Sequence, residues 1–249
     1  MPFYLVSIAY DGSEFTGWAK QPNKFTVQGC IEATLSRIFQ QKINILGASR
    51  TDRGVHARDQ KFTLQLNLDF SAKKLFSILK KTLWKHVLVQ KVKKVNSSFH
   101  PIGSVIRKEY RYFINTYQYN IFQKKYCWEY NQPLQTKKLN QILQIFQGTH
   151  NFFNYAFCRW KDKEQVNTVR EIFTFKSWKK KEVVIIKITS RHFLRYQIRA
   201  LIGEIINCYE GKQTLENLRE KLINFSQTNY YKYKKLAPAS GLYLWKITY

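Results

Sequence analysis

The chain has 249 residues, enough for one large domain or two smaller ones with a buried core. Hydrophobic residues make up 44% of it, which excludes a disordered polyelectrolyte, and 42 Lys and Arg against 16 Asp and Glu give a net charge of +26. Such an excess favours a polyanionic partner, with nucleic acid ahead of an acidic membrane.

Membrane, export and metal signals are weak. The apolar stretches are strand-sized and interrupted by charge, well short of the roughly 20 residues of a spanning helix. Residues 1–15 lack a basic start and a small-residue cleavage site, so we expect no signal peptide and a cytoplasmic location. The four cysteines form no C-x-x-C pair, and a metal shared by His150 and Cys158 would lack further ligands. We therefore expect neither a metal site nor a disulfide framework.

The first part of the chain predicts alternating strands and helices. We expect strands at 3–10, about 43–48, 61–68 and 87–95. Helices are expected at 27–40, with Thr26 as N-cap, and after Ser71. The apolar faces of these two helices carry Val27, Ile31, Leu35 and Ile38, and Leu75, Ile78, Leu79 and Leu83. The strand at 61–68 alternates, with one apolar side formed by Phe62, Leu64, Leu66 and Leu68. The order β-α-β-β-α-β is ferredoxin-like.

The second part repeats that order loosely. We expect strands at 105–115, 168–178, 182–190 and 242–249. Helices are expected from Thr136, at 193–209, and, as an extra element, at 214–225. The predicted fold class is α+β, with two ferredoxin-like halves at 1–98 and 99–249, an extra helix in the second, and a boundary near 97–104. Their antiparallel sheets would enclose a basic cleft suited to folded RNA.

The segment from Gly47 to Arg58, GASRTDRGVHAR, is the most informative for chemistry. Asp52 is one of five aspartates in the chain, and Arg50, Arg53 and Arg58 all lie within six residues of it. Neighbouring guanidinium groups favour the ionised carboxylate. A fixed carboxylate in a basic protein is unusual because it repels the phosphates that the basic surface attracts. By charge pattern alone, a turn aspartate or a surface ion pair fits as well.

Longer strings along the chain resemble the TruA family of tRNA pseudouridine synthases. The central one is R-T-D-x-G-V-H-A, read here from Arg50 to Ala57. The other matching strings, in chain order, are YDGSEFTGWAKQ from Tyr10, TVQGCIE from Thr26, KEYRY from Lys108, GTHNF from Gly148, TVR from Thr168, FLRYQIR from Phe193 with Gly203, and APASGLYL from Ala237. Each string alone is weak, but together and in order they are specific.

The resemblance implies a cofactor-independent enzyme that converts uridine to pseudouridine in the anticodon stem-loop of tRNA, at positions 38 to 40. It implies Asp52 as the catalytic nucleophile or base acting on a flipped-out uridine. The chemical route stays open between attack at C1′, attack at C6 and a glycal. The resemblance also implies a homodimer, with tRNA crossing both subunits. It implies that the protein binds neither a membrane nor a small-molecule cofactor.

Two further catalytic residues follow from the resemblance. Tyr110 would stack on the flipped uracil, and its hydroxyl is a candidate to take the C5 proton. Tyr112, two residues on, is assigned to the core. Arg199 would pair with Asp52 from the helix at 193–209, where it lies about 140° from Leu194.

The remaining candidates are contacts to RNA. Arg50 and Arg58 are assigned to phosphate contact or base extrusion. The other candidate RNA contacts are Arg53, His56, Lys108 and Arg170. For His56 and Arg170 a structural role stays open.

Several positions depart from the family pattern, among them Ala239 and Ser240, which replace a Pro-containing pair. Gln197 replaces the usual Met before Ile198 and Arg199, Asn151 replaces the Asp of GTHDF, and Ile102 stands where many members have Arg. The Ile102 and Asn151 changes bear on RNA contact and leave the chemistry untouched.

Other classes fit less well. A non-catalytic tRNA- or rRNA-binding protein would share the charge and the fold, but it gains nothing from an anion in a basic groove. A zinc nucleobase deaminase is excluded because H-x-E with P-C-x-x-C is missing, and a serine hydrolase because G-x-S-x-G is missing.

Overall fold

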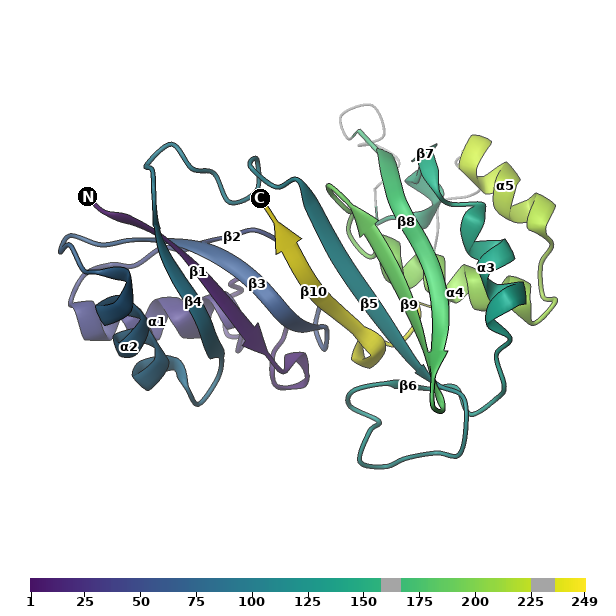
Figure 1. The fold of residues 1–249 in the computed structure, drawn as a ribbon, viewed down its shortest axis with the longest axis horizontal. Coiled ribbons are helices and arrows are strands. Elements are labelled where there is room, and N and C mark those ends of the chain that lie inside the picture. The colour runs from purple at the N-terminus through teal and green to yellow at the C-terminus, as the bar shows by residue number, and fades with distance from the viewer. Residues whose placement is uncertain (158–166, 225–235) are drawn as a thin grey trace. The chain divides into compact units, whose positions relative to one another are not determined.

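A computed structural model describes residues 1–157, 167–224 and 236–249. The chain forms two compact units (Figure 1), the first made of residues 1–108 and 243–249 and the second of residues 109–242. This division differs from the expected halves in two ways. The first stretch ends ten residues after position 98, and the last seven residues join the first unit.

The first unit is built on a sheet with the strand order β4-β1-β3-β10, and β2 pairs with β3. β1 is antiparallel to both β3 and β4, whereas β10 runs parallel to β3. The bounds are β1 Phe3–Tyr10, α1 Val27–Phe39, β2 Leu46–Gly47, β3 His56–Gln65, α2 Ala72–Leu83, β4 Leu88–Val95 and β10 Leu242–Thr248. The first six elements follow the expected order. The expected strand at 43–48 shrinks to two residues, and the added parallel strand lies outside the ferredoxin-like pattern.

Local sequence explains the two helices of this unit. The Thr26 hydroxyl accepts a hydrogen bond from Gly29 N at the start of α1, and Ser71 accepts one from Lys74 N at the start of α2. The buried positions repeat at helical spacing, and they are Val27, Ile31 and Leu35 on α1 and Leu75, Leu79 and Leu83 on α2. Ile38, expected on the same apolar face of α1, is 37% exposed because it lies in the last turn.

β3 begins five residues before the expected strand, at His56 inside the Asp52 segment. Phe62, Leu64 and Leu66 are buried as expected, but Leu68 is 66% exposed. Leu68 lies beyond the end of the strand at Gln65, so the alternation no longer directs its side chain inward. Thr63 on the opposite side is also buried, so this strand has no fully wet face.

The second unit has the strand order β5-β9-β8-β7, with β6 parallel to β5. β8 is antiparallel to both β7 and β9. The bounds are β5 Arg107–Asn115, β6 Trp128–Glu129, α3 Thr136–Gln144, β7 Gly148–Asn151, β8 Val169–Lys180, β9 Val183–Ser190, α4 Gln197–Tyr209 and α5 Leu215–Ile223. The last strand expected for this half is β10, which belongs to the first unit. β7 was not expected, because four polar and small residues carry no strand periodicity.

Helix α4 begins at Gln197, four residues later than the expected 193. Tyr196 takes a left-handed conformation with φ of 61°, which breaks the helical path immediately before Gln197. Leu194 therefore lies in the preceding loop, and the expected helical angle between Leu194 and Arg199 does not apply. α5 begins with a capping box between Thr214 and Asn217.

The helices of the second unit are tied together by packing and by one buried ion pair. α3 packs on β8 and on α4. Glu204 on α4 is 5% exposed, and its carboxylate accepts from Lys221 Nζ on α5 at 2.7 Å. The same carboxylate accepts from Gln213 at 2.7 Å, so its charge is satisfied from two sides.

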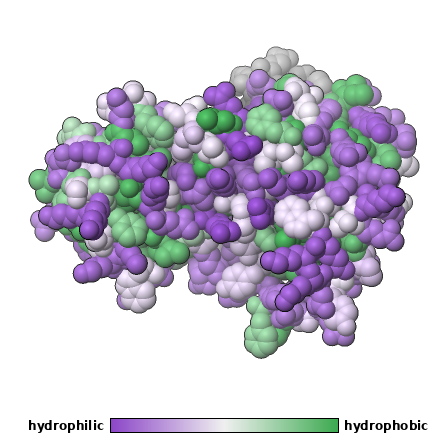
Figure 2. Space-filling view, viewed as in Figure 1, coloured by the Kyte–Doolittle hydropathy of each residue, from purple (hydrophilic) through white to green (hydrophobic). Residues whose placement is uncertain are grey.

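Hydrophilic side chains dominate the face shown in Figure 2. Within the described ranges, no helix has both the length and the apolar character needed to cross a membrane. The thiols of Cys30, Cys127 and Cys208 are free, whereas Cys158, and with it the pairing considered with His150, lies outside the described residues. Across the described parts of the chain, no three His, Cys, Asp or Glu side chains gather as a metal site would require.

Candidate active site

The Asp52 loop connects β2 to β3 in the first unit, and Asp52 is half-buried at its centre. Val55 N donates to Asp52 O at 3.1 Å, and Gly54 has a φ of 78°, so residues 52–55 form a tight turn. Arg50 and Arg53 flank the aspartate and are exposed. The carboxylate is thus held on a fixed turn with two cationic side chains beside it in sequence.

Two glycines near the N-terminus allow the backbone to pack directly against this loop. A Cβ on Gly12 would lie 2.0 Å from Val55 O, and one on Gly17 would lie 2.9 Å from Thr51 O. Gly17 also has a φ of 100°, which side chains rarely allow. Tyr10-Asp11-Gly12 and Gly17-Trp18 are therefore the support of the Asp52 loop.

Hydrogen bonds fix the same contact. Trp18 N donates to Thr51 O at 3.0 Å, and the Tyr10 hydroxyl lies 2.8 Å from Thr51 Oγ1. Thr51 is thereby bound through its backbone and through its side chain, which fixes the residue next to Asp52.

His56 lies inside this support. Its side chain is 2% exposed, and Nδ1 accepts a hydrogen bond from Gly12 N at 3.1 Å. The same nitrogen lies 3.1 Å from Asp11 Oδ1, and the ring stacks on Tyr243 with centroids 4.5 Å apart. These contacts favour a structural role, one of the two alternatives for this residue, because its ring is enclosed by residues of two other motifs.

Lys108 was expected among the RNA contacts, but its ammonium is buried in the first unit. Nζ donates to Ala48 O at 2.7 Å and to Ser49 Oγ at 3.4 Å, so it holds the chain that leads into the Asp52 loop. Burial lowers the pKa of Lys108 from 10.5 to about 8. We therefore assign Lys108 to the support of the loop, because a buried ammonium with these partners is not presented to phosphates.

Arg58 differs from Lys108 and His56. It is exposed on β3, and its guanidinium lies 4.3 Å from the centroid of the Trp245 ring on β10. Stacking on an indole restricts this side chain and leaves it at the surface.

Tyr110 lies on β5 in the second unit and is 5% exposed. Its ring meets Phe193 edge to face, with centroids 5.3 Å apart and an interplanar angle of 85°. Tyr112 on the same strand is 1% exposed and donates its hydroxyl to Pro238 O at 2.7 Å, in keeping with its assignment to the core. Burial raises the pKa of Tyr112 well above its ordinary value.

Arg199, in the first turns of α4, is held by the C-terminal segment. Its Nε donates to Ala237 O at 2.8 Å, and Ala237 N donates to Arg199 O at 3.1 Å. The guanidinium carbon also lies 5.8 Å from the centroid of the Tyr196 ring. The APASGLYL string therefore fixes the guanidinium through its Nε in the second unit, while its Tyr243 contacts His56 in the first.

The GTHNF and TVR strings meet as β7 and β8, where His150 is opposite Arg170. Asn151 Oδ1 accepts from Thr168 Oγ1 at 2.7 Å and from Phe153 N at 3.0 Å. Both bonds need only an acceptor oxygen, so Asn replaces Asp here without loss of the turn. The Arg170 guanidinium donates to the carbonyls of Asn167 and Val169. Both partners lie at or just before the start of β8, the strand that carries Arg170.

Comparisons with known proteins identify the family of this chain. The family profile described as tRNA pseudouridine synthase matches residues 6–102 and 142–249. The chain belongs to the tRNA pseudouridine synthase family.

Three relatives named tRNA pseudouridine synthase A support this membership over nearly the whole length. The protein of Dictyoglomus thermophilum is 36% identical, with 99% of both chains covered. That of Spiroplasma kunkelii is 39% identical over 89% of this chain and 85% of its own, and that of Mycoplasma genitalium is 34% identical over 100% and 99%. A solved Cbf5-Nop10-Gar1 complex gives a TM-score of 0.36 at 12% identity, covering 80% of this chain and 52% of that one.

Membership in this family confirms that the chain is an isomerase and sets aside the alternative of a non-catalytic RNA-binding protein. The resemblance read from the sequence strings is confirmed as well. The roles of individual residues remain a proposal, because Asp52 belongs to one unit while Tyr110 and Arg199 belong to the other.

One further residue of this region was missed as a site residue from sequence. Gln197 was noted only as a departure from the family pattern, yet its side chain is fully buried and its Oε1 accepts from Leu194 N at 2.8 Å. It therefore holds the loop between Phe193, which contacts Tyr110, and Arg199. The available signal was a polar residue among the apolar positions of the helix expected at 193–209.

Proposed function

We propose that this protein converts uridine to pseudouridine in the anticodon stem-loop of tRNA, at positions 38 to 40, with Asp52 as the catalytic carboxylate. The observation that carries the proposal is the construction around Asp52. Two glycines of the string from Tyr10, a buried histidine and a buried lysine all support one turn whose central residue is a half-buried aspartate. A surface turn needs no such support.

The reaction moves one bond without net gain or loss of atoms. The bond between N1 and C1′ breaks, the uracil turns, and C5 joins C1′, while C5 loses a proton and N1 gains one. The uridine must first leave its stack, at a cost of a few kcal/mol. Asp52 then acts as nucleophile or base at the start of glycosidic cleavage, by attack at C1′ or C6 or through a glycal.

Tyr110 and Arg199 complete the proposed site. The Tyr110 ring, which packs edge to face on Phe193, is the proposed stacking partner of the uracil, and its hydroxyl is the proposed acceptor of the C5 proton. The Arg199 guanidinium is fixed at Nε by Ala237 O, and a planar fork can orient a carboxylate from two nitrogens. The proposal requires the two units to bring these groups to the same nucleotide.

Arg50, Arg53 and Arg58 are the proposed phosphate contacts around the flipped base, since all three are exposed and near Asp52 in sequence. A homodimer is proposed on the resemblance alone, and equilibrium sedimentation tests it.

The test uses the purified protein and an unmodified tRNA transcript with uridines at positions 38, 39 and 40. We expect pseudouridine at one or more of these positions, read by chemical sequencing, and release of tritium from uridine labelled at C5. Pseudouridine confined to other parts of the tRNA would overturn the anticodon assignment. No pseudouridine in any folded tRNA would overturn the function.

A further inference from the structure

The connection from β5 to β6 carries a cluster of exposed rings that the proposed chemistry does not use. Phe122 is 86% exposed, and the other large side chains of this loop are exposed by roughly half. They are Tyr117, Tyr119, Ile121 and Tyr126. So many outward apolar groups on one short loop indicate a binding surface.

The loop is a built structure, because its base is closed by two polar side chains. Asn115 Nδ2 donates to Glu129 Oε2 at 2.7 Å and to Gln118 O at 2.8 Å. Asn120 N donates to the same carboxylate at 3.0 Å. The next turn is closed by Asn120, whose side chain accepts from Phe122 N and whose carbonyl accepts from Gln123 N and Lys124 N. The backbone that carries these exposed rings is therefore fixed by hydrogen bonds within the loop.

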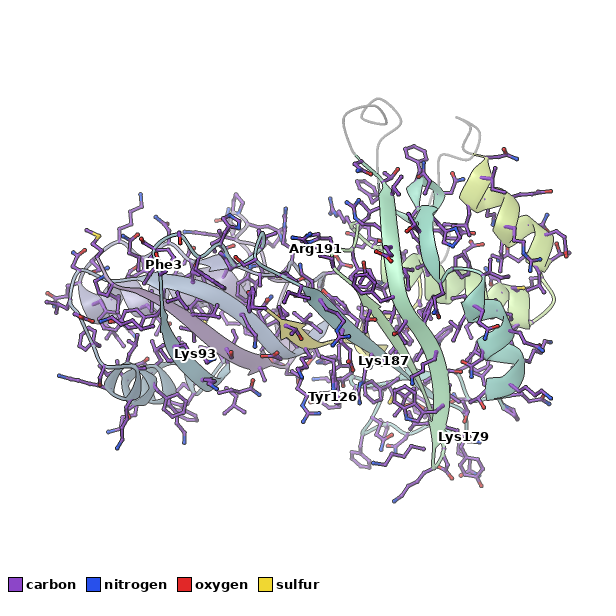
Figure 3. The ribbon with its side chains drawn as sticks, turned by 45° about the horizontal axis from the view of Figure 1, so that its top comes forward. Phe3, Lys93, Tyr126, Lys179, Lys187 and Arg191 are labelled. Atoms are coloured by element: carbon purple, nitrogen blue, oxygen red, sulfur yellow. The ribbon has the colours of Figure 1, made fainter. Side chains whose placement is uncertain are left out.

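Lysines lie beside these rings. Lys124 and Lys125 belong to the loop and are exposed. The turn from β8 to β9 adds Lys179, Lys180 and Lys181, all exposed, and it adjoins the loop because Thr116 N and Oγ1 donate to Glu182 O at 2.9 and 2.6 Å. Figure 3 labels Tyr126 of the loop and Lys179 of β8.

We propose that residues 117–126 and 179–181, the lysine–aromatic surface, bind the RNA substrate, with the rings against bases and the lysines against flanking phosphates. The proposal rests on the proposed function for its substrate. Rings stack on bases regardless of sequence, and ammonium groups bind phosphates with a strong salt dependence. The two segments contain no Asp or Glu, and Glu182 directly follows Lys181.

This surface contacts a part of the RNA other than the target uridine. Tyr110 lies five residues before Asn115 on β5, which is about 16 Å at the rise of a strand. The surface begins just beyond Asn115. Changes here should therefore alter affinity and leave the chemical step intact.

A second copy of this chain fits the surface less well than RNA does. An isologous interface would set the patch against itself and bring its five lysines against five more. Like charges oppose that contact, whereas RNA phosphates relieve the same repulsion. Self-association through this surface is nevertheless an outcome that the test can detect.

The test compares two double variants with a matched control. K180Q/K181Q removes two charges from the surface, Y119A/F122A removes two rings, and K137Q/R219Q removes two exposed charges from α3 and α5 of the same unit. Binding of an unmodified tRNA transcript is measured from 50 to 200 mM salt, together with kcat for pseudouridine formation at saturating tRNA and with the oligomeric state of each variant by equilibrium sedimentation.

We expect Kd to rise about tenfold in Y119A/F122A, since the loss of stacking on one base has about that effect. In K180Q/K181Q the slope of log K against log salt should fall in magnitude by about 1 to 2. The kcat of both variants, and all values of the control, should stay near wild type.

Two outcomes overturn the inference: a Kd within twofold of wild type in both surface variants, or a loss of self-association that accounts for the whole effect. Wild-type protein that binds tRNA through this surface but forms no pseudouridine would instead contradict the proposed function. Circular dichroism confirms that each variant folds.

Discussion

The ammonium of Lys108 lies 2.7 Å from the carbonyl oxygen of Ala48, under the loop that carries Asp52. The burial of this ammonium makes the stability of the protein depend on pH. Burial lowers the pKa of Lys108 from 10.5 to about 8. Between pH 8 and pH 10.5, Lys108 is therefore protonated in the unfolded chain and mostly deprotonated in the folded chain. The contribution of Lys108 to stability therefore rises with pH through this window and is constant below it.

We expect the free energy of unfolding of wild type, relative to Lys108→Met, to grow between pH 7 and pH 10. One pKa unit corresponds to about 1.4 kcal/mol, so the change should reach about 3 kcal/mol at most. Urea denaturation of both proteins across this range measures it. Other titrating groups are common to both proteins and cancel, and a constant difference would contradict the burial of a charged Lys108.

Substitution of Gly12 tests the support of the Asp52 loop. A Cβ there would lie 2.0 Å from Val55 O, so the loop must move in Gly12→Ala. We expect a loss of about 1–3 kcal/mol in the free energy of unfolding and a fall in pseudouridine formation larger than this instability explains. Gly103→Ala is the matched control, because its Cβ would approach His100 no closer than 3.4 Å. Full activity in Gly12→Ala would show that the position of the loop does not matter for catalysis.

Sequence strings identified the family because they preserve residues that contact one another. Tyr10-Asp11-Gly12, the Asp52 segment and Tyr243 are distant in the chain, yet they form one support around His56. Local rules also placed both helices of the first unit, since Thr26 and Ser71 cap them as expected.

Expectations failed where long-range partners decide the outcome. β10 was assigned to the second half, whereas residues 243–249 group with the first unit, where β10 pairs with β3. Lys108 was expected among the RNA contacts and His56 was left open between RNA contact and a structural role, because the partners that bury them, Ala48 for Lys108 and Gly12 and Tyr243 for His56, are distant in sequence. The start of α4 was misplaced because apolar spacing continues through Tyr196, whose positive φ is invisible to periodicity.

Tyr110 and Arg199 should fail at different stages of the reaction. Tyr110→Phe keeps the ring on Phe193 and removes the hydroxyl, so we expect glycosidic cleavage to proceed and release of the C5 proton to slow on the order of 100-fold. Arg199→Lys keeps a charge but loses the planar fork, so cleavage itself should slow by a similar factor.

Quenched single-turnover reactions, with analysis of the bound nucleotide, separate these two cases. Accumulation of an altered uracil in Tyr110→Phe but not in Arg199→Lys supports the assignment. If Tyr110→Phe turns over at the wild-type rate, its role is limited to stacking. If Arg199→Lys does so, another group orients Asp52, and Arg50 is the first to test.

The central claim is that Asp52 breaks the glycosidic bond and does not serve RNA binding. The direct measurement compares Asp52→Asn with wild type for tritium release from tRNA labelled at uridine C5, and for tRNA affinity at the same salt concentration. Asp69→Asn, an exposed aspartate of the same unit, is the control. We predict that Asp52→Asn loses activity by roughly 1,000-fold or more while its Kd stays within a few-fold or tightens. Turnover of Asp52→Asn near the wild-type rate would contradict the account.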